Sequence, residues 1–161
     1  MVFDLLPGRG LSSQLRRGGS FFNGVITPEQ ALCVGVSVSD DPTGAYYLYQ
    51  FEIIQAFPDY PKYGVWPDAY LVGGNDILTG GNPANGYERS ESAYALDRIA
   101  MLRGAPAAYL RFPGETNFLM PASVDGSTPP PDGQAGLFYT FKDADYPPHG
   151  GTLDRLELFE L

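Results

Sequence analysis

Glycine and proline set the strongest limit on what this chain can fold into. The sequence contains 20 glycines and 15 prolines, about a fifth of its residues, and neither type recurs with a fixed period. Both residues destabilise the interior of a helix, and the lack of a period excludes a collagen-like repeat. Eleven tyrosines and ten phenylalanines suit pleated, half-buried surfaces. The composition therefore predicts many short strands joined by turns.

The size and polarity of the chain predict a single folded domain covering residues 1–161. Hydrophobic residues make up 43% of it and charged residues 18%, which separates it from chains that stay disordered for lack of apolar surface. The net charge of −9 disfavours nucleic acids and anionic membranes, because both are bound through Lys and Arg. No apolar run approaches the length of a transmembrane helix. We expect an acidic, soluble domain with no nucleic-acid or membrane partner.

Cys33 and His149 are the only residues of their types. A single cysteine forms no intrachain disulfide, and the apolar neighbours of Cys33 predict a buried, inert thiol. One histidine cannot build a histidine-based zinc site. Both cysteine–histidine catalysis and a zinc cofactor are therefore disfavoured.

Apolar and aromatic runs separated by turn residues predict the strands. These runs cover residues 2–6, 31–38, 46–54, 90–96, 107–112, 137–142 and 152–161. Two further short strands are expected on either side of a bend at residues 66–68, because Pro67 removes a backbone donor. The rest of residues 1–24 is expected to be irregular. Loops are expected at residues 57–62, 73–86 and 121–136.

Two local signals specify a turn and a helix. In residues 39–44, Asp and Ser side chains can bond back to the backbone, Pro42 fixes φ and Gly44 permits a positive φ. Asp97 is expected to cap a short helix that runs through Arg103, with Gly104 as its stop. Because helices do not alternate with strands, the sequence predicts an all-β, mainly antiparallel propeller, sandwich or barrel.

Four motifs resemble those of a group of large, uncharacterised bacterial extracellular proteins. That group carries DPTGxYY, DYPKxGVWPDxYY, ALDRxxML and TPPPxG in this order. The counterparts here are residues 41–47, 59–70, 95–102 and 128–133, so the resemblance covers residues 31–161. Residues 1–19 lack the apolar core of a secretory signal, whereas the resembled proteins are extracellular. The compartment is therefore left open.

The turn at residues 39–44 also resembles the blade turn of five-bladed propeller glycosidases. Residues 59–61, Asp68 and residues 70–73 are the counterparts of the strand pair that follows in those enzymes. This resemblance makes a β-propeller the preferred architecture, although 161 residues supply only about three four-stranded blades. Since an incomplete propeller exposes apolar faces, we expect either a homo-oligomer or a fragment of a longer protein.

Asp59, Asp68 and Glu115 are the candidate catalytic residues. Glycoside hydrolysis uses two carboxylates on either side of a sugar, roughly 5 to 10 Å apart. The glycosidase resemblance implies that Asp59 tunes the pKa of the acid and that Glu115 is the acid. The aspartate that acts as base in those enzymes has no counterpart here. Bonding to backbone N–H groups in turns is the alternative role for Asp59.

Tyr60, Tyr63, Trp66 and Tyr70 are the candidate ligand-binding residues. Their rings can form a stacking platform for a sugar or another apolar surface. Aromatic rings of this kind also fill protein cores, and this alternative stays open.

Two acidic pairs, Asp40 with Asp41 and Asp143 with Asp145, offer oxygen ligands to Ca²⁺. Neither pair has the ligand spacing of a calcium loop with its closing glutamate. We therefore expect solvated turn carboxylates and no cofactor or metal.

The missing catalytic set favours a non-enzymatic, self-associating β module that binds a carbohydrate or a protein partner. One alternative is a glycosidase-like enzyme, active or degenerate, that uses Asp59, Asp68 and Glu115. Another is a truncated piece of a longer secreted propeller protein. The sequence specifies neither a ligand nor an oligomeric state.

Overall fold

The computed structural model describes residues 1–17, 30–78, 89–114, 118–145 and 153–161. Sheet A contains β1 (Val2–Asp4), β2 (Arg9–Arg17), β3 (Gln30–Ser37) and β4 (Tyr46–Glu52). Sheet B contains β5 (Ala56–Val65), β6 (Ala69–Leu78), β7 (Arg89–Asp97) and β8 (Tyr109–Gly114). Sheet C contains β9 (Met120–Pro121), β10 (Leu137–Lys142) and β11 (Arg155–Glu160). The helix α1 (Arg98–Leu102) joins β7 to β8.

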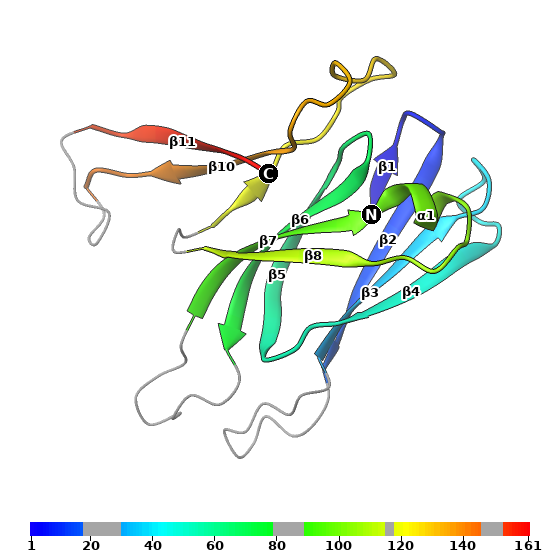
Figure 1. Ribbon diagram of the computed structural model, residues 1–161, viewed down its shortest axis with the longest axis horizontal. Helices are drawn as coiled ribbons and strands as arrows, with labels where there is room; N and C mark the ends of the chain where they lie inside the picture. The colour runs from blue at the N-terminus through cyan, green and yellow to red at the C-terminus, as the bar shows by residue number, and fades with distance from the viewer. Residues whose placement is uncertain (18–29, 79–88, 115–117, 146–152) are drawn as a thin grey trace.

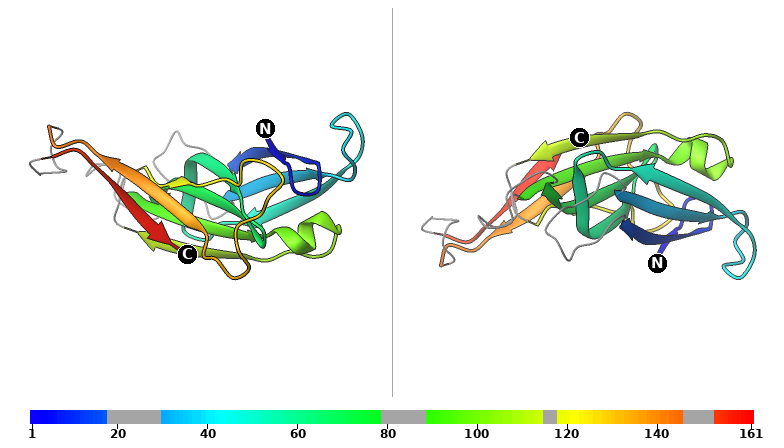
Figure 2. Two further views of the ribbon diagram at one scale, coloured as in Figure 1. Left: turned by 90° about the horizontal axis from the view of Figure 1, so that it is seen from above. Right: turned by 90° about the horizontal axis from the view of Figure 1, so that it is seen from below.

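Each sheet is an antiparallel meander, in which strands adjacent in sequence are hydrogen-bonded neighbours. Sheet B lies between sheets A and C (Figure 1), and the hairpin of β10 and β11 projects away from the other two sheets (Figure 2). The first strand of each sheet contacts the first strand of the next sheet: β1 contacts β5, and β5 contacts β9. None of the three sheets, as far as they are described, closes into a barrel. The all-β, antiparallel prediction is confirmed, and the arrangement fits an incomplete propeller or a sandwich.

Side-chain alternation gives sheet A one buried face. Leu32, Val34 and Val36 of β3 point toward sheet B and are almost fully buried. They belong to one core with Tyr70 and Tyr94 of sheet B. Packing between sheets A and B therefore forms this core.

Along the described chain, no helix is long and apolar enough to cross a membrane.

The second face of sheet B packs against β9 and sheet C. Leu71 and Ala93 from sheet B, Leu119 just before β9 and Phe138 from β10 are buried together. Sheet B is thus covered on both faces, whereas sheets A and C each bury one.

Gly64 and Gly73 allow the chain around β9 to lie directly on sheet B. A Cβ atom at Gly64 would collide with the backbone carbonyl of Ala122, and one at Gly73 with that of Leu119. Any larger residue would push this segment away from the sheet. The glycine-rich stretch expected to be a loop is therefore strand β6 as far as residue 78, and that prediction was wrong there. Residues 79–86 of the expected loop lie outside the described residues.

A buried carboxylate fastens sheet A to sheet B. Asp4 of β1 is 0% exposed, and its Oδ2 accepts hydrogen bonds from Arg98 Nε at 2.6 Å and from the Tyr70 hydroxyl at 2.9 Å. Arg98 Nη2 also donates to Asp4 Oδ1 at 3.1 Å, and Nη1 donates to the Pro67 carbonyl at 2.6 Å. Burial and the neighbouring Asp4 carboxylate raise the pKa of Tyr70, so its hydroxyl remains a donor.

The helix and the turn at residues 39–44 follow their local sequence signals. The Asp97 side chain caps α1 by accepting a backbone N–H at 3.0 Å, and Gly104 follows its end with a φ of 67°. In the turn, Asp41 Oδ1 accepts from the Thr43 amide at 2.9 Å. Gly44, however, is not among the described glycines with positive φ, so the reason given for it was wrong. The turn closes instead through the Gly44 amide, which donates to the Asp41 carbonyl.

Two other segments expected to be irregular are strands. Residues 9–17 form β2, and residues 57–62 belong to β5. Pro58 and Pro61 are tolerated because β5 is an edge strand, with a register shift between Asp59 and Lys62. The strands on either side of the bend at residues 66–68 are ten residues long rather than short. Pairing with a neighbouring strand overrides the local turn composition in each case.

Asp4→Asn is expected to lower the free energy of unfolding by about 3 to 5 kcal/mol, because it leaves the buried Arg98 guanidinium without its counter-charge. Urea unfolding monitored by circular dichroism measures the change. Glu157→Gln, which breaks the exposed pair with Arg155, is the control and should cost less than about 1 kcal/mol. Equal losses in the two variants would contradict a special role for Asp4.

Gly73→Ala is expected to lower stability by about 1 to 3 kcal/mol, because the added methyl group forces β9 away from sheet B. Gly74→Ala is the matched control in the same strand, since its Cβ atom would meet only ordinary contacts of 3.5 Å or more. Thermal unfolding of the two variants compares them directly. A similar melting temperature for both would show that β9 does not require a glycine beneath it.

Candidate functional site

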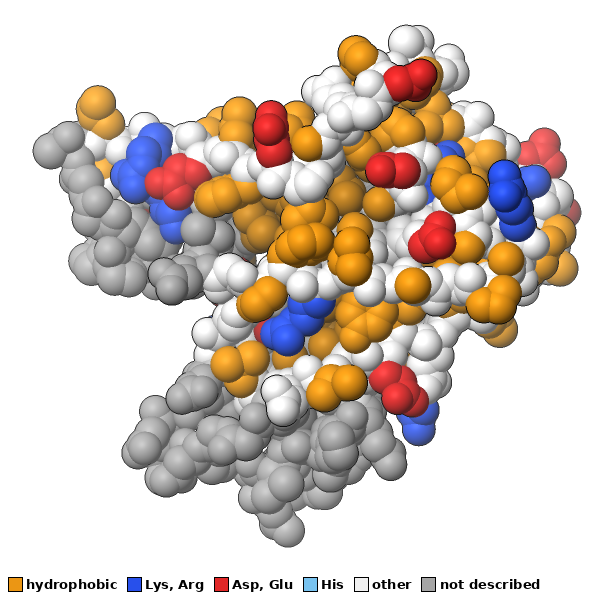
Figure 3. Space-filling view, in the orientation of Figure 1, with side chains coloured by type: hydrophobic (Ala, Val, Ile, Leu, Met, Phe, Trp, Pro, Cys, Tyr) orange, Lys and Arg blue, Asp and Glu red, His pale blue; other side chains and the backbone are white. Residues whose placement is uncertain are grey.

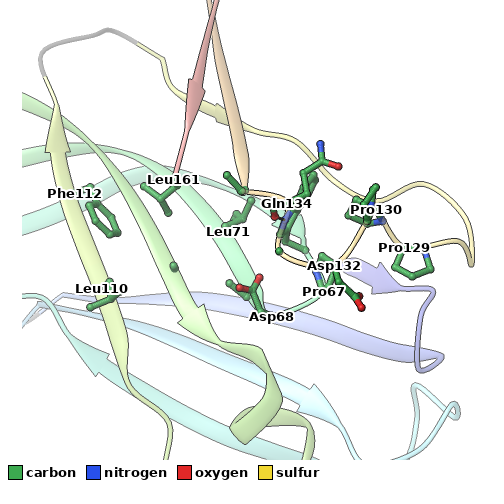
Figure 4. A pocket seen from close by; sticks show the side chains of 17 residues that line it. Pro67, Asp68, Leu71, Leu110, Phe112, Pro129, Pro130, Asp132, Gln134 and Leu161 are labelled. Carbon is green, nitrogen blue, oxygen red and sulfur yellow. Dashed lines mark hydrogen bonds between the residues drawn. The ribbon is translucent and has the colours of Figure 1, made fainter.

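A groove lies between the second face of sheet B and the loop of residues 129–136 (Figure 4). Its volume is about 680 Å³. Strands β6, β7 and β8 supply one side, the loop supplies the other, and Leu161 also lines it. A hollow of this size is in the range of small-molecule sites.

The sheet side of the groove is apolar and open to solvent. Leu110 and Phe112 alternate along β8 with Tyr109 and Arg111, which face sheet A. Leu110 is 62% exposed and Phe112 is 43% exposed, because sheet C does not extend over them. In Figure 3, hydrophobic side chains gather in the middle of this face of the molecule. Large side chains exposed side by side in a hollow indicate a binding surface.

Two exposed carboxylates border this apolar side. Asp68 follows β5 in the bend before β6, and Asp132 lies on the loop opposite (Figure 4). Neither forms a hydrogen bond or ion pair with another described residue, so both are free to accept from a ligand. No Lys or Arg is among the described residues that line the groove. The groove therefore combines an apolar surface with hydrogen-bond acceptors, and its charge disfavours anions.

Hydrogen bonds hold the loop side in place. The Trp66 indole donates to the Gln134 carbonyl at 2.9 Å, and the Val124 amide donates to the Val65 carbonyl at 2.9 Å. The chain between β9 and β10, which includes this loop, is thus attached to the end of the β5–β6 hairpin at two points. A site whose walls are fixed before binding loses less conformational entropy when a ligand binds.

The four aromatic residues expected to bind a ligand are not brought together. Trp66 lines the groove but is 6% exposed, so little of its ring is accessible. Tyr70 is buried against Asp4, and Tyr63 packs against the core between sheets A and B. Tyr60 is exposed on β5, with Lys62 Nζ 3.0 Å from the centre of its ring. Of the predicted platform, only Trp66 lies at the groove.

The two candidate catalytic residues that the structure describes, Asp59 and Asp68, are also separated. Asp59 pairs with Asn75, six residues along β6 from Ala69, while Asp68 lies in the bend just before Ala69. A strand rise of about 3.3 Å per residue places Asp59 and Asp68 roughly 20 Å apart, at opposite ends of the hairpin. This distance exceeds what paired carboxylates need. Glu115 lies outside the described residues.

Cys33 lies on the outward face of sheet A and is partly exposed rather than buried. His149 lies outside the described residues. The free thiol faces away from the groove, so it takes no part in that site.

The candidate calcium ligands lie in two hairpin turns. Asp40 and Asp41 are exposed between β3 and β4, and the Asp41 carboxylate accepts hydrogen bonds from Thr43, which lower its pKa. Asp143 and Asp145 follow β10, where Asp143 Oδ1 accepts the Asp145 amide at 2.9 Å. Within the described part of the chain, no three His, Cys, Asp or Glu side chains are grouped to hold a metal ion.

Glu91 is a buried carboxylate that local sequence does not distinguish. It lies on β7, on the face toward sheet C, is 6% exposed, and its Oε2 has no hydrogen-bond partner among the described residues. Burial, with a smaller contribution from Asp76, raises its pKa to about 7, while Arg89 and Lys142 oppose the shift. Glu91 therefore exchanges its proton near neutral pH, inside the interface between sheets B and C.

No family model matches this chain, and no curated protein or solved structure matches it either. The resemblance to bacterial extracellular proteins and to propeller glycosidases therefore stays a prediction. The function is inferred from the groove itself.

Glu91→Gln is expected to remove a pH dependence of stability. Between the ordinary pKa of 4.5 and the folded value of about 7, the unfolded chain is ionised at Glu91 while the folded chain keeps the proton. The free energy of unfolding therefore falls as the pH rises through this interval and then levels off. Glutamine does not ionise, so the free energy of unfolding of the variant should rise relative to that of the wild type over the same interval.

Urea unfolding at several values between pH 4.5 and 8 measures this difference. Glu157→Gln, at a more exposed position on β11, is the control and should follow the wild-type profile. A Glu91→Gln profile parallel to that of the wild type would show that the buried carboxyl does not titrate in this range.

Proposed function

We propose that this protein is a non-catalytic binding module and that its groove binds a neutral carbohydrate. The observation that carries the proposal is the pairing of an exposed apolar side, Leu110 and Phe112, with free carboxylates at Asp68 and Asp132. A sugar ring presents both kinds of surface, since its C–H face is apolar and its hydroxyl groups donate hydrogen bonds.

Each side of the groove has a distinct role in this proposal. The Phe112 ring offers a flat surface for the C–H face of a sugar, as aromatic rings do in ligand sites. Asp68 and Asp132 accept hydrogen bonds from hydroxyl groups, and charged acceptors form stronger bonds than neutral ones. With no Lys or Arg among the described lining residues, the groove disfavours sulfated or carboxylated glycans. Carbohydrate is also the ligand class that the glycosidase resemblance implies.

The positions of the carboxylates favour binding over hydrolysis. Of the three catalytic candidates from the sequence, Asp68 lines the groove and Asp59 lies at the other end of the hairpin. Asp132, the second carboxylate of the groove, is on an exposed loop. A retaining or inverting hydrolase needs two carboxyl groups roughly 5 to 10 Å apart, whereas Asp59 and Asp68 are about 20 Å apart.

Titration with neutral and acidic oligosaccharides tests the proposal. We expect a neutral glycan to bind and to change the fluorescence of Trp66, the lone tryptophan, whose side chain lines the groove. Phe112→Ala should weaken binding at least about tenfold, which corresponds to 1.4 kcal/mol. Asp68→Asn should weaken it less, because the amide oxygen still accepts a hydrogen bond.

Tyr60→Ala is the matched control, since it removes an exposed aromatic ring outside the groove and should leave affinity unchanged. Preferential binding of acidic glycans, or equal losses from Phe112→Ala and Tyr60→Ala, would contradict the site. Release of reducing sugar from a bound glycan would contradict the non-catalytic assignment.

A further inference from the structure

We infer that copies of this chain associate head to tail, the outward face of sheet C in one protomer packing into the outward face of sheet A in its partner. This interface uses neither side of the groove and does not depend on the proposed carbohydrate binding. It follows from two sheet faces that no other described sheet covers.

The outward face of sheet C is a ridge of bulky apolar side chains. Tyr139 pairs across the strands with Leu158, and Phe141 pairs with Leu156. Their exposed fractions are 37% and 71% in the first pair and 55% and 64% in the second. Together they leave on the order of 400 Å² of apolar surface in contact with water. A patch of this size is comparable to the largest apolar patch on an ordinary protein surface, and such patches are often functional.

The outward face of sheet A has a hollow, whereas the outward face of sheet C has a ridge. The outward residues of the central strand β3 of sheet A are all small, and two of them, Cys33 and Gly35, line the hollow, whereas Ala31 and Ser37 on the same face are each 1% exposed. Met1, Ser12 and Gln14 border the two lining residues on one side and Tyr46, Leu48 and Gln50 on the other, and Leu48 is 81% exposed. The hollow between these borders measures about 570 Å³. It can therefore receive a row of large side chains.

The same kind of packing already holds sheets B and C together. There, Gly73 and Ala93 of sheet B form a flat surface, and the bulky Leu119 and Phe138 are buried against it. Within one chain, sheet A packs on sheet B and sheet B on sheet C. If the partner placed its sheet A on the outward face of sheet C, it would add one further layer to this stack. Sheets that pack face to face keep their strands nearly aligned, which both faces allow because each belongs to a regular meander.

A second copy explains both uncovered faces with one contact. Packing two sheet C ridges against each other would oppose bulky side chains and leave the hollow on sheet A unfilled. The head-to-tail contact covers the ridge of one protomer and the hollow of its partner. Such a heterologous contact either closes into a ring or continues to further copies.

Light scattering after size exclusion, over a hundredfold range of concentration, tests the association. We expect a mass that is a multiple of the 17.5 kDa chain and that falls on dilution. Leu158→Glu on sheet C and Leu48→Glu on sheet A should each weaken self-association at least about tenfold, because either places an unpaired charge in the interface. Both side chains are mostly exposed in the single chain, so both variants should fold like the wild type, as circular dichroism can verify.

Mixing the two variants decides the geometry. Leu158→Glu retains an intact sheet A face and Leu48→Glu an intact sheet C face, so together they should form a dimer with one chain of each. Ile54→Glu, equally exposed but outside both faces, should associate like the wild type. A wild-type mass of 17.5 kDa at all concentrations would overturn the inference. So would self-association by Leu48→Glu alone, since that result would require contact between two copies of sheet C.

Discussion

The contact between the Asp4 carboxylate and the Arg98 guanidinium determines how the first two sheets meet. It joins the first strand of sheet A to the start of α1, and the Tyr70 hydroxyl from the middle of sheet B completes it. The same guanidinium holds the Pro67 carbonyl at 2.6 Å, next to Trp66 and Asp68. One buried ion pair therefore positions both the sheet interface and one end of the groove. A buried charge without its partner is costly, so these elements depend on one another.

A second network of the same kind stiffens sheet B. Asp76 of β6 accepts the Tyr94 hydroxyl at 2.6 Å and Arg111 Nη2 at 2.7 Å, which ties β6, β7 and β8 together on the face toward sheet A. Because Arg111 is drawn to this face, its β8 neighbours Leu110 and Phe112 are presented on the other. The apolar side of the groove is thus a consequence of strand alternation around a satisfied charge.

Residue size on each sheet face accounts for what is covered and what is left open. Small residues on the second face of sheet B let β9 lie directly on the backbone, while the loop that follows it stands off the sheet and leaves the groove. Small residues on the outward face of sheet A produce a hollow, and large residues on sheet C produce a ridge that stays exposed among the described residues. The groove and the ridge lie on different surfaces, so a ligand and a second copy of the chain need not compete.

The sequence by itself determined the all-β class, the helix capped by Asp97, the hairpin at residues 39–44 and several strands, because each depends on neighbours within a few residues. It also singled out Asp68 and Trp66 at the groove. Only the tertiary structure decided that residues 57–62 and 73–78 are strands and that Leu110, Phe112 and Asp132 share one site. Proline and glycine indicate a turn locally, yet pairing within sheet B and the close approach of Leu119 and Ala122 outweigh that preference. Contacts between residues so far apart in sequence leave no local pattern from which to predict them.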